Sequence, residues 1–275
     1  MKLSHSRAAT SAVFDDPNLV SAAGLVPVLA LADAAGLSTL AGEHLSVPGD
    51  KGANAGLKVS SLIAGMVAGA DSINDMAPLR HGGMGRVFAR AYAPSTLGSF
   101  LRAFTFGHVR QLDAVASRFL TNLTAAAGQG PQVASGTPAR VLVDVDDTII
   151  EVHGYAKQGA GFGYSSVRGL NALLATVTTA GTAPVVVAQR LRKGSCGSPR
   201  GAKRLVADAL KTVNKLHPGP GKPLLRADSA FYGAPTIGAA VRGGAQVSVT
   251  VRLDPKVKAA IAAIAHDAWT SIEYT

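Results

Sequence analysis

The apolar positions in the first half of the chain recur at the three- and four-residue spacing of amphipathic helices. The clearest such stripe comprises Val109, Leu112, Val115, Ala116, Phe119 and Leu123. Other helical runs cover residues 25–40, 57–70, 72–79 and 97–106. Pro94, with Ser95 or Thr96 as the cap, is a good start for the last of these. The pattern predicts an all-α domain over residues 1–127.

A different pattern begins beyond residues 128–140, a segment rich in Gly, Pro and Ser that predicts a linker. The β-branched runs after it predict strands over residues 141–151, 170–178, 184–191, 223–231 and 246–253. Residues 159–166 are glycine-rich and predict a turn or hairpin. Helical patterns cover residues 201–216, 235–242 and 256–265. Strands that alternate with helices in this way predict an α/β layered domain over residues 141–275.

The net charge of the chain indicates what kind of partner it binds. The chain of 275 residues has 27 Lys and Arg against 17 Asp and Glu, a formal net charge of +10. Residues 189–226 are the densest part, with ten basic residues and one acid, Asp208. Such a cluster indicates a polyanionic partner, and a generic basic surface is the alternative.

Other classes are disfavoured by what the chain contains. Cys196 is the single cysteine, so neither a disulfide framework nor a cysteine-based zinc site can form within one chain, and a reducing cytoplasm fits. The N-terminal residues have no apolar run typical of a signal peptide. The longest apolar stretch includes Pro27 and Asp33, so we expect a buried helix and no membrane partner.

Acidic side chains interrupt two of the predicted strands. Asp144 and Asp146 share one face of the first strand, because side chains alternate along a strand. Two carboxylates so close require a cation, a basic partner or water nearby. A Mg²⁺ or Mn²⁺ site is one interpretation, and a solvated strand end is the other. Asp228 ends a later strand, either as a third candidate ligand or as a helix cap.

Two known families share the motif VLVDVDDT, which begins at Val141. It resembles the nucleophile motif of haloacid-dehalogenase-type phosphatases, which implies Asp144 as nucleophile and Asp146 as general acid/base. Lys222 could supply that family's lysine. The later acidic pair that this family needs is missing, because the next acid after Asp228 is Asp254.

A second resemblance covers the chain from about residue 15 to its end. It rests on DVDDTIIEVHGYAKQGAGFGYSSVRGLN from Asp144, RADSAFYG from Arg226 and PSTLGSFLRAFTFGH from Pro94. These motifs resemble DDE insertion-sequence transposases, above all the insertion-sequence thirteen-eighty family, which is related to the four-type group.

This resemblance implies an RNase H-like catalytic core that follows a helical DNA-binding domain. By motif position, Asp146 and Asp228 are the first two catalytic acids and metal ligands, with Asp144 as the alternative first acid. Two Mg²⁺ or Mn²⁺ ions would then support phosphodiester cleavage and strand transfer at terminal inverted repeats. It also implies double-stranded DNA as the partner, a homo-oligomer at full length, and a cytoplasmic, nucleoid-associated location.

One part of the family pattern is missing. A DDE site takes its third acid, a Glu, from a late helix, and Glu273 lies in a strand-like context at the end of this chain. We therefore expect a C-terminally truncated and inactive transposase. A DNA-binding remnant, or an inhibitor of full-length transposase, is the alternative.

Basic residues in both domains are the candidate DNA contacts. In the second domain they end the third predicted strand or open the helix after it. Arg102 is the candidate in the helical domain, near the helix start at Pro94. The candidates of the second domain are Arg190, Arg192, Lys193, Arg200, Lys203 and Arg204.

Overall fold

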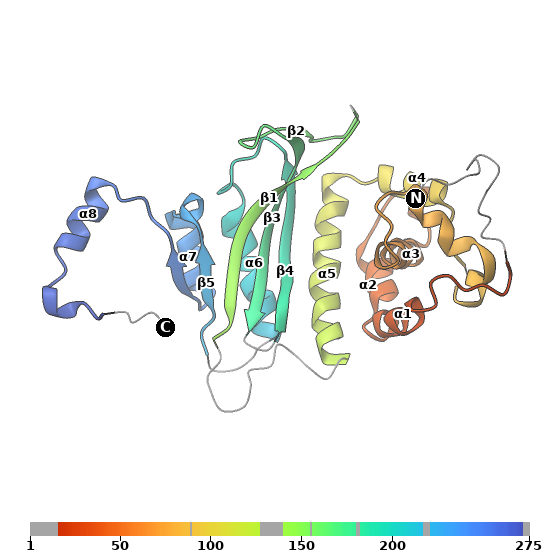
Figure 1. Cartoon of the computed structure of the whole chain (residues 1–275), viewed down its shortest axis with the longest axis horizontal. Helices are drawn as coiled ribbons and strands as arrows, with labels where there is room; N and C mark the ends of the chain where they lie inside the picture. Colours follow the sequence, from red (N-terminus) through yellow and green to blue (C-terminus); the bar gives the residue numbers. More distant parts are fainter. Residues whose placement is uncertain are drawn as a thin grey trace, which may run out of the picture. The chain divides into compact units, whose positions relative to one another are not determined.

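The computed structural model describes residues 16–88, 90–126, 140–154, 156–179, 182–216 and 221–271. The chain divides into two compact units, Met1–Gly130 and Pro131–Thr275 (Figure 1). The boundary between them falls in the segment whose composition predicts a linker.

The first unit is helical throughout its described part. Its helices are α1 (Leu25–Ala34), α2 (Leu37–His44), α3 (Ala55–Val67), α4 (Pro94–Arg102) and α5 (Phe106–Ala126), with short 3-10 turns at Asp50–Gly52, Asn74–Arg80 and Gly82–Arg86. Leu97 and Phe100 of α4 are completely buried in its apolar core. The apolar periodicity marks a buried face in α3 and α4, whereas α5, which carries the clearest apolar stripe, fully buries only Val115.

Lys58 is an exception to the apolar character of this core. Its side chain is buried, its Nζ donates to the carbonyl of Lys51 at 2.8 Å, and the same atom lies 5.3 Å from the ring centroid of Phe100. A carbonyl acceptor and an aromatic face both compensate a buried ammonium group. This lysine therefore belongs to the structure of the helical unit.

Within the described residues, no single helix combines the length and the apolar character needed to cross a membrane. Leu25–Ala34 and Leu37–His44 meet the test of length and composition only as a pair, and that pair is bent by 53°.

The second unit is built on a mixed sheet of six strands (Figure 1). They are β1 (Leu142–Glu151), β2 (Gly161–Phe162), β3 (Arg168–Thr179), β4 (Thr182–Lys193), β5 (Leu224–Ala227) and β6 (Gln246–Val249). The order is β2-β3-β1-β5-β6, and β4 also pairs with β3. Pairs among β1, β3 and β4 are antiparallel, whereas β5 pairs parallel with both β1 and β6. The predicted mixed α/β class is confirmed.

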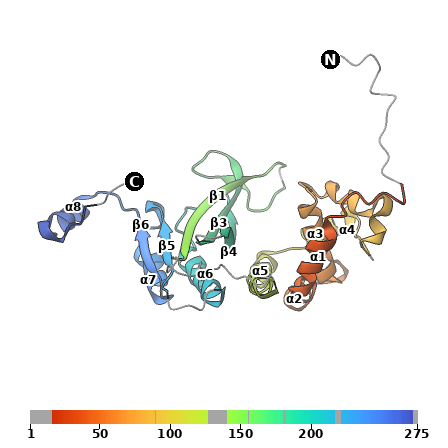
Figure 2. The same cartoon turned by 60° about the horizontal axis from the view of Figure 1, so that its bottom comes forward.

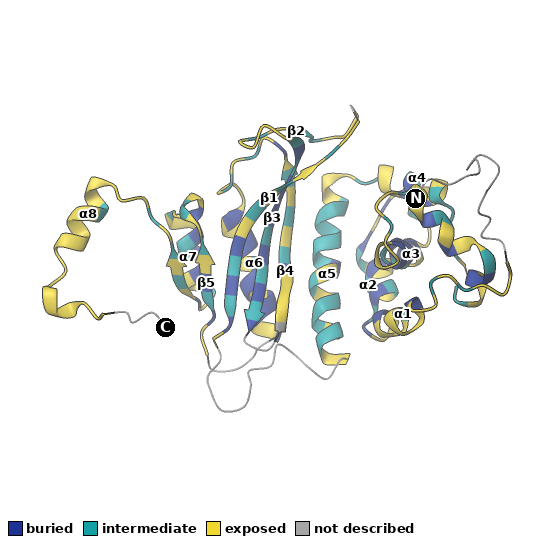
Figure 3. Ribbon diagram, in the orientation of Figure 1, coloured by how far each residue is buried: buried dark blue, intermediate teal, exposed yellow. Residues whose placement is uncertain are grey.

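Helices α6 (Ala202–Leu216) and α7 (Ala234–Arg242) lie on the same side of this sheet (Figure 2). Val143 and Leu225, on that side of β1 and β5, are completely buried. Helix α6 buries Leu205, Val206, Ala209, Leu210 and Val213 and exposes the opposite stripe (Figure 3). In the described part of this unit, no helix covers the other face, and α8 (Pro255–Ala262) has no buried residue.

Two predicted strands end earlier in the structure than the sequence pattern suggests. The strand predicted over 223–231 ends at Ala227, and Ser229–Phe231 form a 3-10 turn. The strand predicted over 246–253 ends at Val249. Beyond His266–Ala268 the described chain has no strand, and Glu273 lies outside the described residues. Strand β6 is short because it lies at the edge of the sheet and pairs with β5, which is itself only four residues long.

Arg192 of β4 joins three parts of this unit. Its Nη2 donates to Asp147 Oδ2 of β1 at 2.9 Å and its Nε donates to Asn171 Oδ1 of β3 at 2.8 Å. Its Nη1 donates to the carbonyls of Ser198 at 2.9 Å and Arg200 at 2.6 Å, in the loop before α6. The Arg192 and Asp147 side chains are only 8% and 14% exposed. A buried pair satisfied by this many hydrogen bonds fixes the loop against the sheet.

Replacement of Arg192 by Met should lower the free energy of unfolding by about 3–5 kcal/mol, because it leaves the Asp147 carboxylate buried without its cation. Lys193→Met, at the exposed neighbouring position, is the matched control and should change stability by less than about 0.5 kcal/mol. Chemical unfolding of both variants measures the difference. Equal stabilities of the two variants would show that the Arg192 contacts do not hold the unit together.

Candidate active site

The acids of β1 divide between the two faces of the sheet. Asp144 and Asp146 lie on the face that α6 and α7 leave uncovered, and Asp147 lies on the covered face with Arg192. The sequence prediction that Asp144 and Asp146 share a face agrees with this register. Asp147, which the sequence analysis left without a role, belongs to the buried network.

Asp144 is engaged by Arg226 of β5. Strands β1 and β5 pair in parallel with Asp144 opposite Arg226. Nε of Arg226 donates to Oδ1 at 2.6 Å and Nη2 donates to Oδ2 at 2.8 Å, so both carboxylate oxygens are occupied. These side-chain hydrogen bonds, with the attraction between the two charges, raise the pKa of Arg226. This partner is not evident from the sequence, because only the strand register places the two residues together.

Asp146 lies within β1, and Asp228 directly follows the end of the neighbouring strand β5 at Ala227. The β1–β5 register runs to Val145 opposite Ala227, and one further residue sets Asp146 beside Asp228. Adjacent strands are about 5 Å apart. Both side chains are exposed and on the same face as Asp144. The register therefore brings the predicted pair to the same level of the sheet, although 82 positions separate the two acids in sequence (228 − 146).

Each of these two carboxylates is held by one local hydrogen bond. Asp146 Oδ1 accepts from the amide of Asp147 at 2.8 Å, and Asp228 Oδ1 accepts from the amide of Ala230 at 2.9 Å as the cap of the 3-10 turn. Asp228 thus has the capping role that its sequence context allowed. Among the described residues, no side chain donates to either carboxylate, so the second oxygen of each is open to a ligand.

The basic residues predicted to contact DNA differ in how exposed they are. Arg192 is buried as described, and Arg190 is 14% exposed and pairs with Asp208 at 2.7 Å. Both are held by the protein itself. The remaining candidates of this unit are exposed: Lys193, Arg200, Lys203 and Arg204. Arg102, in the helical unit, is also exposed and donates to Ser99 Oγ at 3.2 Å.

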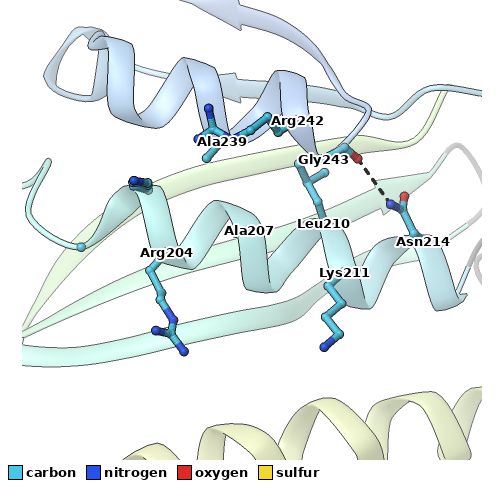
Figure 4. A pocket seen from close by; sticks show the side chains of 10 residues that line it. Arg204, Ala207, Leu210, Lys211, Asn214, Ala239, Arg242 and Gly243 are labelled. Atoms are coloured by element: carbon cyan, nitrogen blue, oxygen red, sulfur yellow. Dashed lines mark hydrogen bonds between the residues drawn. The ribbon is translucent and has the colours of Figure 1, made fainter.

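A groove of about 900 Å³ lies between α6 and α7 (Figure 4). Lys203, Arg204, Lys211 and Arg242 line it, and the groove has no acidic lining residue. Asn214 Nδ2 donates across it to the carbonyl of Gly243 at 3.4 Å. We call these four residues the cationic groove. It lies on the helical side of the sheet, opposite the face that carries Asp146 and Asp228.

A complete metal cage is not formed by the described part of the chain. No group of three or more His, Cys, Asp or Glu residues in it could hold a metal ion. Asp146 and Asp228 together supply two carboxylates, which are oxygen donors of the kind that Mg²⁺ and Mn²⁺ prefer. The arrangement therefore fits part of a divalent-cation site.

Comparisons with known proteins found a family model that matches the chain and a solved structure to which the chain is similar. The family described as transposase DDE domain group 1 matches residues 4–275. No curated protein matches the chain. Among solved structures, a cryo-EM structure of the piggyBac transposase synaptic complex with hairpin DNA is 13% identical, with a TM-score of 0.33. That match covers 92% of this chain and 46% of the piggyBac chain, so this chain spans about half the length of that protein.

The family match extends over almost the whole sequence and includes both Asp146 and Asp228. The chain belongs to the family of transposases with a DDE domain of group 1.

Proposed function

We propose that this chain provides the first two acids of a metal-dependent DNA transposase, with Asp146 and Asp228 as the catalytic pair. The observation that carries the proposal is the parallel register of β1 and β5, which brings Asp146, within β1, to the level of Asp228, directly after β5, each with one carboxylate oxygen open. The reaction would be phosphodiester cleavage and strand transfer at terminal inverted repeats. An insertion sequence of the thirteen-eighty family is the element we propose as its source.

The sheet supports an RNase H-like assignment for the second unit. Three antiparallel strands, β4, β3 and β1, continue into the parallel strands β5 and β6, and α6 makes the crossover between β4 and β5. This arrangement sets the carboxyl end of β5 beside the middle of β1, and ligand sites gather at the carboxyl ends of parallel strands in α/β sheets. The fold assignment is part of the proposal.

Asp146 and Asp228 are the residues that would hold Mg²⁺ or Mn²⁺. When bound, such ions activate the attacking oxygen and stabilise the leaving oxygen of a phosphodiester. Asp144 is a poor alternative as first acid, because Arg226 occupies both of its oxygens. In the proposed site Asp144 and Arg226 instead fix the relative position of β1 and β5, and with it the spacing of the two ligands.

The same ion pair argues against a phosphatase of the haloacid-dehalogenase type. That mechanism would need Asp144 as an open nucleophile, and its carboxylate is bound on both oxygens by Arg226.

DNA binding is proposed for the exposed cations, among them Lys193, Arg200 and the cationic groove. Exposed Lys and Arg side chains bind phosphates and release counterions. For Arg190 and Arg192 we propose a structural role, since both are largely buried and paired. A homo-oligomer at full length and a cytoplasmic, nucleoid-associated location remain parts of this proposal.

We further propose that this polypeptide alone is inactive in cleavage, because two carboxylates leave a two-metal site incomplete. A plasmid-nicking assay with Mg²⁺ or Mn²⁺ should give no more product for the 275-residue chain than for its Asp146→Asn and Asp228→Asn variants. Nicking by the unsubstituted chain that either variant abolishes would contradict the proposed inactivity. DNA binding, measured in parallel by gel shift, should persist in all three proteins.

Neutralising the cationic groove should weaken binding to duplex DNA. The triple variant Lys203→Gln, Arg204→Gln and Lys211→Gln should reduce the slope of log K against log salt by about 3, because each lost phosphate contact removes about 0.9. Fluorescence anisotropy of a labelled duplex at several salt concentrations measures the slope.

The matched control removes the same charge from another exposed segment, as Arg252→Gln, Lys256→Gln and Lys258→Gln, all beside or within α8. Its slope should stay close to that of the unsubstituted chain. An equal loss in both triple variants would mean that net charge, and not the cationic groove, determines the affinity.

A further inference from the structure

The connection between β1 and β3 carries two exposed aromatic residues that the proposed function leaves without a role. Strand β2 leads into a tight turn, in which the amide of Ser166 donates to the carbonyl of Gly163 at 3.1 Å. The side chain of Phe162, in β2, is 66% exposed and that of Tyr164, in the turn, is fully exposed. We call residues 161–168 the aromatic hairpin; it starts at β2, which is labelled in Figure 1.

Glycines pack the backbone of the aromatic hairpin tightly against its neighbours. A Cβ atom at Gly163 would lie 2.5 Å from the carbonyl oxygen of Gly194, and one at Gly194 would lie 2.0 Å from that of Gly169. Such approaches are possible only without side chains. Arg168 Nη1 also donates to the carbonyl of Gly154 at 2.8 Å. The backbone of the aromatic hairpin is therefore closely packed against neighbouring strands, while its aromatic rings are exposed to solvent.

Phe162 lies on the same face of the sheet as the proposed catalytic acids. It pairs with Arg168 of β3, and alternation along β3 places Leu174 on the face of Arg168. Leu174 in turn pairs with Asp146. Consistent with this, a Cβ atom at Gly161, the preceding residue, would contact Ser195 in the loop that leads to α6. The ring and the acid thus lie on the face that α6 and α7 leave uncovered.

A cation accompanies the Phe162 ring on this face. Lys193 pairs with Leu170, which lies two residues from Arg168 on the same face of β3. Its side chain is exposed, and its Cγ would lie 3.9 Å from a Cβ atom at Gly159, just before the hairpin. Exposed aromatic rings beside a basic side chain are the combination that binds unpaired nucleic acid, by stacking on bases and contacting phosphates.

The distance along β1 from the aromatic hairpin to the acids equals the length of a short stretch of stacked DNA. The hairpin joins β1 at Val152, whose amide donates to the carbonyl of Arg168, six residues beyond Asp146 (152 − 146). Six residues of strand span about 20 Å. A stacked DNA strand rises about 3.4 Å per nucleotide, so the rings would meet a base about six nucleotides from the phosphate at the acids.

We propose that Phe162 and Tyr164 stack on unpaired bases of the DNA strand whose phosphate is presented to Asp146 and Asp228. This inference rests on the proposed function. The bases must be unpaired, because a base inside a duplex already has both faces covered by its neighbours. The aromatic hairpin would then position a strand end or an opened segment near the acids.

The test compares a blunt DNA duplex with the same duplex extended by an unpaired 3′ tail of about six nucleotides. The full chain should bind the tailed probe more tightly, and 2-aminopurine in the tail should lose fluorescence as it stacks. Phe162→Ala with Tyr164→Ala should weaken binding of the tailed probe by about thirtyfold or more and leave the blunt probe unchanged. Phe162→Trp with Tyr164→Phe, which keeps both rings, should bind like the unsubstituted chain.

Trp269→Ala, at another exposed aromatic residue, is the matched control and should change neither probe. Equal loss in this control, or an alanine variant that keeps its preference for the tail, overturns the proposal while DNA binding stands. A changed oligomeric state with an unchanged tail preference overturns it too, because the rings would then contact protein. If the alanine variant fails to unfold cooperatively, loss of tail preference in single Tyr164→Ala, at a fully exposed position, decides the question. Failure of the unsubstituted chain to bind either probe refutes the proposed function itself.

Discussion

The parallel pairing of β1 with β5 is the constraint on which the proposed site depends. Its register sets Asp144 opposite Arg226 and carries Asp146 to the level of Asp228. A shift by one residue would turn each side chain to the other face of its strand and separate the acids. The bidentate ion pair between Asp144 and Arg226 joins residues that are directly opposite in this register, so it stabilises the same alignment that the ligands require.

The two faces of the sheet differ in function. One face packs on α6 and α7, where buried Val143 and Leu225 and the Arg192 network hold the layers together. The uncovered face carries the open carboxylates and the aromatic hairpin. The cationic groove lies on the helical side, so phosphates bound there cannot be the ones that meet the acids. Any DNA on the groove is a separate segment or a part of the same molecule some distance from the reaction.

Sequence patterns predicted much of this arrangement where local chemistry decides it. The buried stripe of α6 follows from its helical spacing of apolar residues. In β1 the alternation of residues separates a buried apolar face from the face that carries Asp144 and Asp146. The sequence predicts Arg192 as a DNA contact, because it lies in a segment dense in basic residues. Alternation along β4 turns it inward, toward Asp147 and Asn171, and a linear charge count cannot show that. The choice between Asp144 and Asp146 stayed open for a similar reason, because Arg226 lies 82 positions away from Asp144 (226 − 144).

The central claim is that Asp146 and Asp228, and not Asp144, bind the divalent cation. Titration of the full chain with Mn²⁺, followed by electron paramagnetic resonance of the free ion, tests it most directly. The account predicts binding that is lost in Asp146→Asn and in Asp228→Asn and kept in Asp144→Asn, with cooperative unfolding of each variant as the check on folding. Binding that survives in both Asp146→Asn and Asp228→Asn, or that is lost only in Asp144→Asn, would contradict it.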